Sequence, residues 1–315
     1  MNLPHLAQRL FNTPLALHPS KAEVIMASVM DRFGISKIES SLAMEDDWYG
    51  YDDNRGRESR SDPGYDNVLG VAVIPICGTL VQKLGSLRPY SGMTGYDGIR
   101  QAFLTAMEDP DISGICLDID SPGGEVAGCF DLVDVIYGSR GKKPIHAILT
   151  ESAYSAAYAI ASAADRISVP RTGGVGSVGV ITMHLDWTQR IKDDGLKVTI
   201  ITYGSRKVEG SPLRELSDEA LAAIQQDINT MGELFVNTVA RNRGISAKVI
   251  KSTQAACFMA ADGVEIGQVF STYQEGEIVQ DPKTKEKVKL PGQYVGSVMI
   301  FKSFDRISYA YVLES

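Results

Sequence analysis

The fold is decided by the stretch Ile112-Ser-Gly-Ile-Cys-Leu-Asp-Ile-Asp-Ser-Pro-Gly-Gly-Glu-Val-Ala-Gly-Cys-Phe-Asp-Leu-Val-Asp-Val-Ile-Tyr137. It begins with a β-branched run, passes through a glycine turn and ends in a segment of helical periodicity. Similar runs lie on both sides, so the sequence predicts an α/β fold: a mostly parallel sheet with helices packed on its faces. The expected strands and helices alternate over residues 68–76, 95–108, 112–119, 126–137, 144–149 and 155–164.

Further along the chain, we expect strands at 178–183 and 197–203, with a short helix around 185–191 between them. The longest helix is predicted to begin after Ser217, a suitable N-cap, and to end at Gly244. Its apolar side chains follow spacings of three and four residues, which predicts one stripe buried in the core. The stripe consists of Leu221, Ile224, Ile228, Met231 and Phe235.

Changes of composition divide the chain into three expected parts. Residues 1–67 are predicted to form a helical N-terminal lead-in followed by a polar linker, and the helical pattern is clearest at 22–30. Residues 68–270 form the α/β domain. Residues 271–315 predict a small strand-rich appendage, which is marginal for folding alone.

The composition excludes several classes of protein. The chain has 315 residues, 44% apolar residues and a net charge of -8, so it lacks the basic footprint of a nucleic-acid binder. Its four cysteines form no C-x-x-C pair and are expected to be reduced, with no metal and no cofactor. No signal-peptide core and no membrane-length apolar run occurs, so we expect a cytoplasmic protein without a membrane anchor.

The run Gly174-Val-Gly-Ser-Val-Gly179 fits the G-x-G-x-x-G pattern of dinucleotide sites. It runs into the expected strand 178–183 instead of opening a helix, so the required strand, loop and helix context is missing. We therefore do not expect a dinucleotide site.

Two stretches suggest catalytic chemistry. Ser121-Pro-Gly-Gly124 ends a buried strand, and a helix is expected to begin immediately, leaving the amides of Gly123 and Gly124 free to bind an oxyanion. The alternative is a tight turn that merely needs glycine.

The second stretch places Ser155 at the start of an alanine-rich helix, after a strand and a loop. Its hydroxyl could act as a nucleophile, and the Ala156 amide could help to stabilise a tetrahedral intermediate. The alternative is a helix-capping or packing serine. A serine nucleophile needs a base, and Lys207 could serve if desolvation lowered its pKa; otherwise it is an ordinary loop lysine.

Four motifs in order closely resemble the signal peptide peptidase A family of serine-lysine peptidases, which share a fold with Clp protease and crotonases. They are Ser121-Pro-Gly-Gly, Tyr154-Ser-Ala-Ala-Tyr, Gly176-Ser-Val-Gly-Val and Lys207, and the resemblance covers residues 68–267. It implies a crotonase-like or Clp-protease-like fold of repeated ββα units, with Ser155 as nucleophile and Lys207 as base. Ser177 would orient the lysine. Alanines at 156 and 157 depart from the glycines common in the family.

Within the family, phage capsid-assembly proteases of the lambda-type head protein C subclass compete with membrane-anchored peptidases that digest signal peptides. The absent anchor and the stretch Leu15-Ala-Leu-His-Pro-Ser-Lys21, similar to phage members, favour the phage subclass. We therefore expect a soluble serine endopeptidase that cleaves scaffold and capsid proteins in the prohead, as a homo-oligomer with shared active sites. The alternatives are a bacterial signal-peptide-degrading peptidase and a non-catalytic capsid scaffold component.

Overall fold

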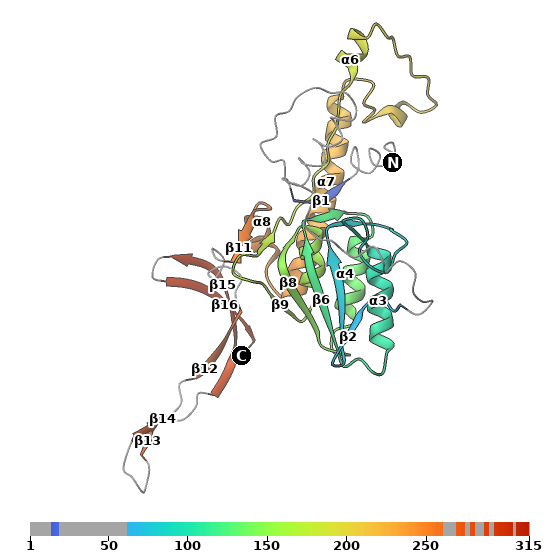
Figure 1. Ribbon diagram of the computed structural model, residues 1–315. Coiled ribbons are helices and arrows are strands. Elements are labelled where there is room, and N and C mark those ends of the chain that lie inside the picture. The colour runs from blue at the N-terminus through green and yellow to red at the C-terminus, as the bar shows by residue number, and fades with distance from the viewer. Residues whose placement is uncertain are drawn as a thin grey trace. The chain divides into compact units, whose positions relative to one another are not determined.

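The computed structural model describes residues 14–18 and 62–260, and beyond them only strands between 269 and 314 (Figure 1). The chain divides into two compact units. One contains residues 1–170 and 174–257, and the other contains residues 171–173 and 258–315. The helix expected around residues 22–30 lies outside the described residues.

The first unit is built on a parallel sheet with helices, which confirms the expected α/β class. Its strands follow the order β10-β8-β6-β3-β2, and β9 also pairs with β8; only β2 runs antiparallel to its neighbour. The strands are β2 (Asp66–Val68), β3 (Val71–Cys77), β6 (Gly114–Ser121), β8 (Ile145–Tyr154), β9 (Arg166–Ser168) and β10 (Gly174–Gly176). The helices between them are α3 (Tyr96–Glu108), α4 (Cys129–Gly138) and α5 (Ala156–Ser162).

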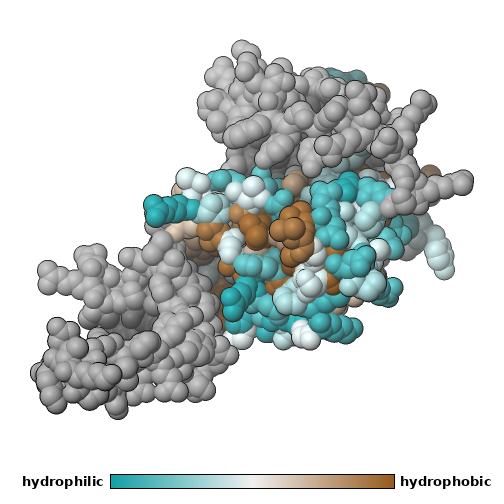
Figure 2. Space-filling model, turned by 60° about the horizontal axis from the view of Figure 1, so that its bottom comes forward, coloured by the Kyte–Doolittle hydropathy of each residue, from teal (hydrophilic) through white to brown (hydrophobic). Residues whose placement is uncertain are grey.

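The two faces of this sheet differ in burial. Along β3 and β6, alternate residues are buried beside the helices, while those between them are only half-buried. Helices were expected on both faces, but one face is left open among the described residues. Apolar side chains on or next to its strands stay exposed, including Val68, Ile148 and Val169. In Figure 2, hydrophobic side chains gather among hydrophilic ones on the face turned to the viewer.

A second, smaller sheet lies at the end of β6, where a helix was expected to begin. Its order is β1-β7-β4-β5, made of β1 (Leu15–Leu17), β7 (Gly123–Glu125), β4 (Thr79–Val81) and β5 (Met93–Gly95). The sequence prediction was wrong here, because the glycine pair forms β7 and α4 begins only at Cys129. Gly124 lies so close to β4 that an added Cβ would be 1.9 Å from the Leu80 carbonyl oxygen. The pair is therefore needed for close strand packing.

The long helix α7 (Asp218–Arg243) has the predicted ends. The Ser217 hydroxyl accepts a hydrogen bond from the Ala220 amide, and Gly244 ends the helix in the left-handed conformation. The prediction of one fully buried stripe was wrong for the first half of the helix, since Leu221 is 53% exposed while Phe235 is completely buried. Only the C-terminal half of α7 packs into the core.

The segment between β10 and α7 contains little regular structure. The strands expected at 178–183 and 197–203 are absent; Ile181 makes an isolated bridge to Leu15, and residues 197–203 pair with no described strand. Only a short helix, α6 (Thr188–Asp193), and one 3-10 turn, η2 (Ser205–Val208), occur there. Strand propensity needs neighbouring strands along the length of a segment, and in the part of the chain that the structure describes this segment has only the single bridge between Ile181 and Leu15.

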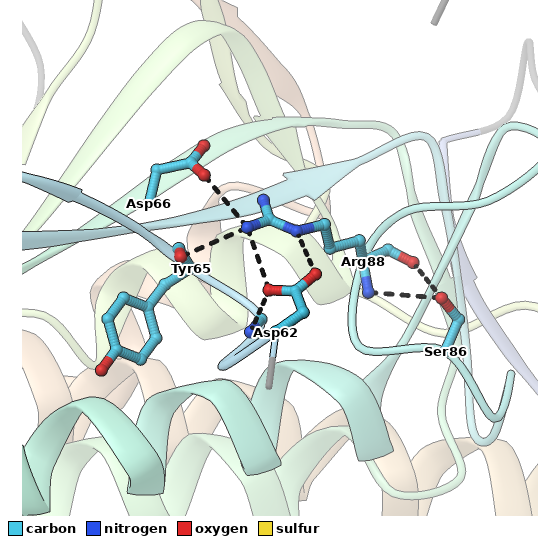
Figure 3. A network of polar contacts seen from close by, with 6 residues as sticks. Asp62, Tyr65, Asp66, Ser86 and Arg88 are labelled. Atoms are coloured by element: carbon cyan, nitrogen blue, oxygen red, sulfur yellow. Dashed lines mark hydrogen bonds and ion pairs between the residues drawn. The ribbon is translucent and has the colours of Figure 1, made fainter. Parts of the chain in front are cut away.

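The entry to β2 is held by Arg88 (Figure 3). Its Nε donates to Asp62 Oδ2 at 2.7 Å, and its Nη2 donates to Asp62 Oδ1, to the Tyr65 carbonyl oxygen and to Asp66 Oδ1. Tyr65 is buried, and its hydroxyl donates to Asp109 Oδ2 at 2.6 Å. Residues 62–66, expected in a solvated linker, are therefore packed against the first unit.

The second unit consists largely of strands, as predicted for the C-terminal appendage. β12 (Val269–Gln274), β15 (Gln293–Phe304) and β16 (Ile307–Glu314) form one antiparallel sheet, and β13 (Ile278–Gln280) pairs with β14 (Lys287–Lys289). α8 (Ala247–Ser252) precedes the boundary between the two units, and β11 (Cys257–Met259) crosses it.

Candidate active site

Ser155 lies in a sharp turn between β8 and α5. The expected loop is absent, because β8 continues to Tyr154 and α5 begins at Ala156. Ser155 adopts φ 53° and ψ −121°, a conformation that costs an L-residue energy and is found at functional sites. Its N–H donates to the Gly176 carbonyl oxygen at 2.8 Å, and the residue is completely buried.

The run Gly174–Gly176 lies beside this turn. It forms β10, which pairs in parallel with β8 so that Gly176 faces Tyr154. An added Cβ on Gly174 would be 1.8 Å from the Tyr154 hydroxyl oxygen, so this glycine leaves room for the Tyr154 side chain. The G-x-G-x-x-G pattern thus starts in a strand and opens no helix.

Ser177 follows β10 and is nearly buried, with a positive φ of 55°. Its N–H donates to the Ala256 carbonyl oxygen at 2.9 Å. Burial raises the pKa of the Cys257 thiol, and a side-chain hydrogen bond with Ser177 lowers it by less. Among the residues that the structure describes, the Ser177 side chain thus contacts this thiol and makes no hydrogen bond to a lysine.

Gly123 lies directly against Ser155. It has φ 98°, and an added Cβ would lie 2.3 Å from the Ala16 carbonyl oxygen and 3.0 Å from Ser155 Cβ. Its N–H donates to Ser121 Oγ at 3.1 Å. Gly124 faces Ala16 across the β1–β7 pair, so neither glycine amide is free in this state.

Ala156 contributes the third amide expected at the site. It is the first residue of α5, and an N–H at that position has no acceptor within the helix. The structure therefore brings Ser155, Ala156, Ser177 and the two glycines together around one turn.

Lys207 is not brought to this turn. It lies in η2 and is exposed, next to an ion pair of Arg206 and Glu209 at 3.0 Å. Within residues 62–260, no hydrogen bond or ion pair joins its ammonium group to Ser155 or Ser177. The single chain thus holds a serine site without the expected base.

Sequence reasoning missed β1 as part of this site. Leu15–Leu17 is buried and pairs with β7, and the His18 ring contacts the Tyr154 ring in a tilted arrangement, with centroids 4.7 Å apart and 49° between the ring planes. The signal available in the sequence was weak: an apolar triplet between Pro14 and Pro19, both of which favour extended backbone.

A cluster of polar residues lies near the C-terminal ends of β6 and β8. The Thr150 hydroxyl donates to Asp118, and the Ser152 amide donates to Asp120 at 3.4 Å. Burial, with smaller effects of the nearby carboxylates, raises the pKa of Asp120. Among the described residues, no group of three His, Cys, Asp or Glu side chains could hold a metal ion, and no helix is long and apolar enough to cross a membrane.

Comparisons with known proteins give consistent matches. The model of Peptidase family S49 matches residues 139–289, which extends past residue 267, where the expected resemblance ended. Capsid assembly protease C of Escherichia phage lambda is 34% identical over 303 residues, covering 92% of this chain and 68% of that protein. Head-tail preconnector protein GP5 of Enterobacteria phage P21 is 37% identical over 271 residues, covering 84% of this chain and 54% of that protein.

Among solved structures, the ClpP1 N165D mutant from Listeria monocytogenes has a TM-score of 0.36 and 14% identity. The match covers 61% of this chain and 84% of the ClpP1 chain.

Proposed function

Because the chain belongs to peptidase family S49 and is a serine peptidase, we propose that it cleaves scaffold and capsid proteins inside an assembling phage head. Membership of the family agrees with the resemblance expected from the four sequence motifs. The capsid substrates are proposed by analogy with the lambda protein, of which this chain spans about two thirds.

In the proposed mechanism, Ser155 Oγ attacks the carbonyl carbon of the scissile peptide bond while its proton passes to the neutral amine of Lys207. The oxyanion is held by backbone N–H groups of Ala156 and of the glycine pair. The protonated lysine then gives its proton to the leaving amine, and the acyl group stays on Ser155. Water, deprotonated by the same lysine, hydrolyses this ester and restores the serine.

The observation that carries this proposal is the turn at Ser155. Ser155 is buried in a strained backbone conformation, at the N-terminus of a helix and against a glycine of positive φ. Such strain costs conformational energy, and it is found mainly at functional sites. This arrangement supports the proposal that Ser155 is a nucleophile beside a backbone oxyanion site.

We further propose that the base comes from a second copy of the chain. An exposed lysine stays hydrated and protonated, so Lys207 needs an apolar surrounding to act as a base at neutral pH. The segment that leads to it exposes Leu196 (63%), Ile201 (92%) and Tyr203 fully. Apolar surface of this kind supports an interface, which would carry Lys207 to a neighbouring Ser155 and bury it there.

The first test of the nucleophile is the variant Ser155→Ala, incubated with a phage head scaffold protein beside wild type. We expect wild type alone to give defined cleavage products by mass spectrometry, and a fluorophosphonate to label wild type at Ser155. Ser252→Ala, which changes an exposed serine in α8, is the matched control and should cleave like wild type. Undiminished cleavage by Ser155→Ala would show that another residue is the nucleophile.

The second test separates the base from its positioning residue. Lys207→Ala should abolish hydrolysis, whereas Ser177→Ala should cost only about 1–3 kcal/mol in transition-state stabilisation, because it removes one orienting hydrogen bond. Mixing inactive Ser155→Ala with inactive Lys207→Ala should restore part of the activity, since some interfaces then pair an intact serine with an intact lysine. Absence of rescue in oligomers that exchange subunits would place both residues in one chain.

A further inference from the structure

We propose that the segment Pro14–His18 is an internal inhibitory peptide. It fills the groove at Ser155 as an antiparallel strand, and it must leave before a peptide of another chain can be cleaved. This inference rests on the proposed function, because it takes the groove at Ser155 to be the substrate site.

The segment is held on both edges in the way an extended peptide is bound. On one edge it pairs with β7: the His18 N–H donates to the Pro122 carbonyl oxygen at 2.9 Å, and the Val126 N–H donates to the Pro14 carbonyl oxygen at 3.3 Å. These flanking bonds make Ala16 and Gly124 the next hydrogen-bonded pair of the ladder. The backbone of this strand thus pairs with the N–H and C=O groups of Gly124, while the Gly123 N–H donates to Ser121 Oγ.

On the other edge the segment pairs with Ile181. The Leu15 N–H donates to the Ile181 carbonyl oxygen at 2.8 Å, and the Ile181 N–H donates back at 2.9 Å. Ile181 lies four residues after Ser177, on the segment that also passes Ser155, since Ser155 Oγ is 3.5 Å from the Gly179 carbonyl oxygen. β1 therefore lies in a groove between the glycine pair and the Ser177 segment.

The same segment seals the nucleophile. The Ala16 carbonyl oxygen and Ser155 Cβ approach the same point of Gly123, and the His18 ring contacts the ring of Tyr154, the neighbour of Ser155, in a tilted arrangement. With β1 in place, Ser155 is completely buried. A serine that must attack a peptide carbonyl has no access to one while β1 is in place.

The side chains of the segment indicate what the groove accepts. Leu15 and Leu17 are each 4% exposed and Ala16 is 1% exposed. Main-chain hydrogen bonds supply binding in such strand addition, and pockets for alternate side chains supply selectivity. We therefore expect substrates to be extended segments with apolar side chains two residues apart and a small residue between them.

The decisive variant is Leu15→Asp combined with Leu17→Asp, which opposes burial of β1 and leaves Ser155 and Lys207 unchanged. Removal of a bound competitor raises the fraction of open sites, so we expect kcat/KM for a short fluorogenic peptide to rise roughly tenfold or more. Labelling of Ser155 by a fluorophosphonate should accelerate in parallel. The matched control is Leu69→Asp with Leu104→Asp, two exposed leucines outside the site, which should leave both rates unchanged.

A second measurement supplies the segment in trans. The synthetic peptide Thr13–Pro19 should inhibit the double variant competitively, and a scrambled peptide should not. If the double variant does not fold, Leu17→Asp alone gives the same comparison with a smaller perturbation.

The outcomes separate this inference from the proposed function. Faster labelling with no peptide hydrolysis by any form would support the occupied groove and refute the peptidase. Hydrolysis that requires Ser155 but is unchanged or lost in the folded double variant, without faster labelling, would refute the inhibitory segment and leave the peptidase intact.

Discussion

Strain at Ser155 makes a prediction that does not depend on activity. Replacement of Ser155 by alanine keeps Cβ in the unusual backbone conformation, whereas replacement by glycine removes the Cβ that makes φ 53° unfavourable. Ser162, at the other end of α5, is the matched position, because it is also completely buried but lies within the helix. We compare alanine with glycine at both positions.

The expected stability difference between the glycine and alanine variants can be estimated at each position. Glycine loses about 1 kcal/mol to alanine in a helix, and it loses burial of one methyl, about 0.8 kcal/mol, so Ser162→Gly should be roughly 1–2 kcal/mol less stable than Ser162→Ala. Ser155 lies before the helix, so the helix-propensity cost of glycine does not apply there, and the lost methyl burial is offset by release of about 1–3 kcal/mol of backbone strain. The gap between glycine and alanine should therefore close or reverse at Ser155.

Thermal unfolding of the four variants measures this difference. A change of 1 kcal/mol shifts the midpoint by about 2–4 °C in a domain of this size, so the two alanine-to-glycine gaps should differ by roughly 4–8 °C. Equal gaps at the two positions would mean that Ser155 is not strained, and the argument for a presented nucleophile would lose its physical basis.

Three further predictions concern polar groups of the first unit. Arg140 donates to carbonyl oxygens at the C-terminal end of α5 and to that of Asn242, so Arg140→Ala should lower the unfolding free energy by about 3 kcal/mol in denaturant titration, and Arg140→Lys by less. Arg88 forms a partly exposed salt bridge with Asp62, and Arg88→Lys should lower the unfolding free energy by only about 1 kcal/mol in the same assay. Burial raises the pKa of Asp120 in the folded state, so its charge opposes folding above that pKa; Asp120→Asn should stabilise the protein at pH 7, with the gain disappearing below about pH 4, where both states are protonated. A lower unfolding free energy of Asp120→Asn than of wild type at pH 7 would contradict this prediction.

The helices were predictable because their signals are local. The N-cap Ser217 and the terminal Gly244 mark both ends of α7, and the start of α5 follows from the alanine run after Ser155. The alternating strands and helices of the first unit follow from periodicity in the same way. The position of Ser155 at the start of α5 was therefore accessible from sequence, but the sharp turn directly from β8 was not.

The small sheet was not predictable, because its strands are set by distant neighbours. Gly123 and Gly124 have low strand propensity, and they form β7 only because β1 and β4 lie on its two edges. Likewise, the four residues between Pro14 and Pro19 carry too little pattern to predict a strand. What the Gly124 amide binds in this state thus depends on a contact more than a hundred residues away in the chain.

The wrong strand predictions and the missing base have one explanation in the proposed assembly. Residues 197–203 are rich in β-branched side chains, as strands are, yet Val198 (42%), Ile200 (40%) and Ile201 (92%) are exposed and pair with no described strand. Apolar side chains in this segment indicate that it is buried in the functional state of the protein, because exposing apolar surface to water costs free energy. The first half of α7, with Leu221 exposed, shows the same mismatch. A second copy that covered these surfaces would satisfy the pattern and desolvate Lys207 in the same step, so the base would become functional only where subunits meet.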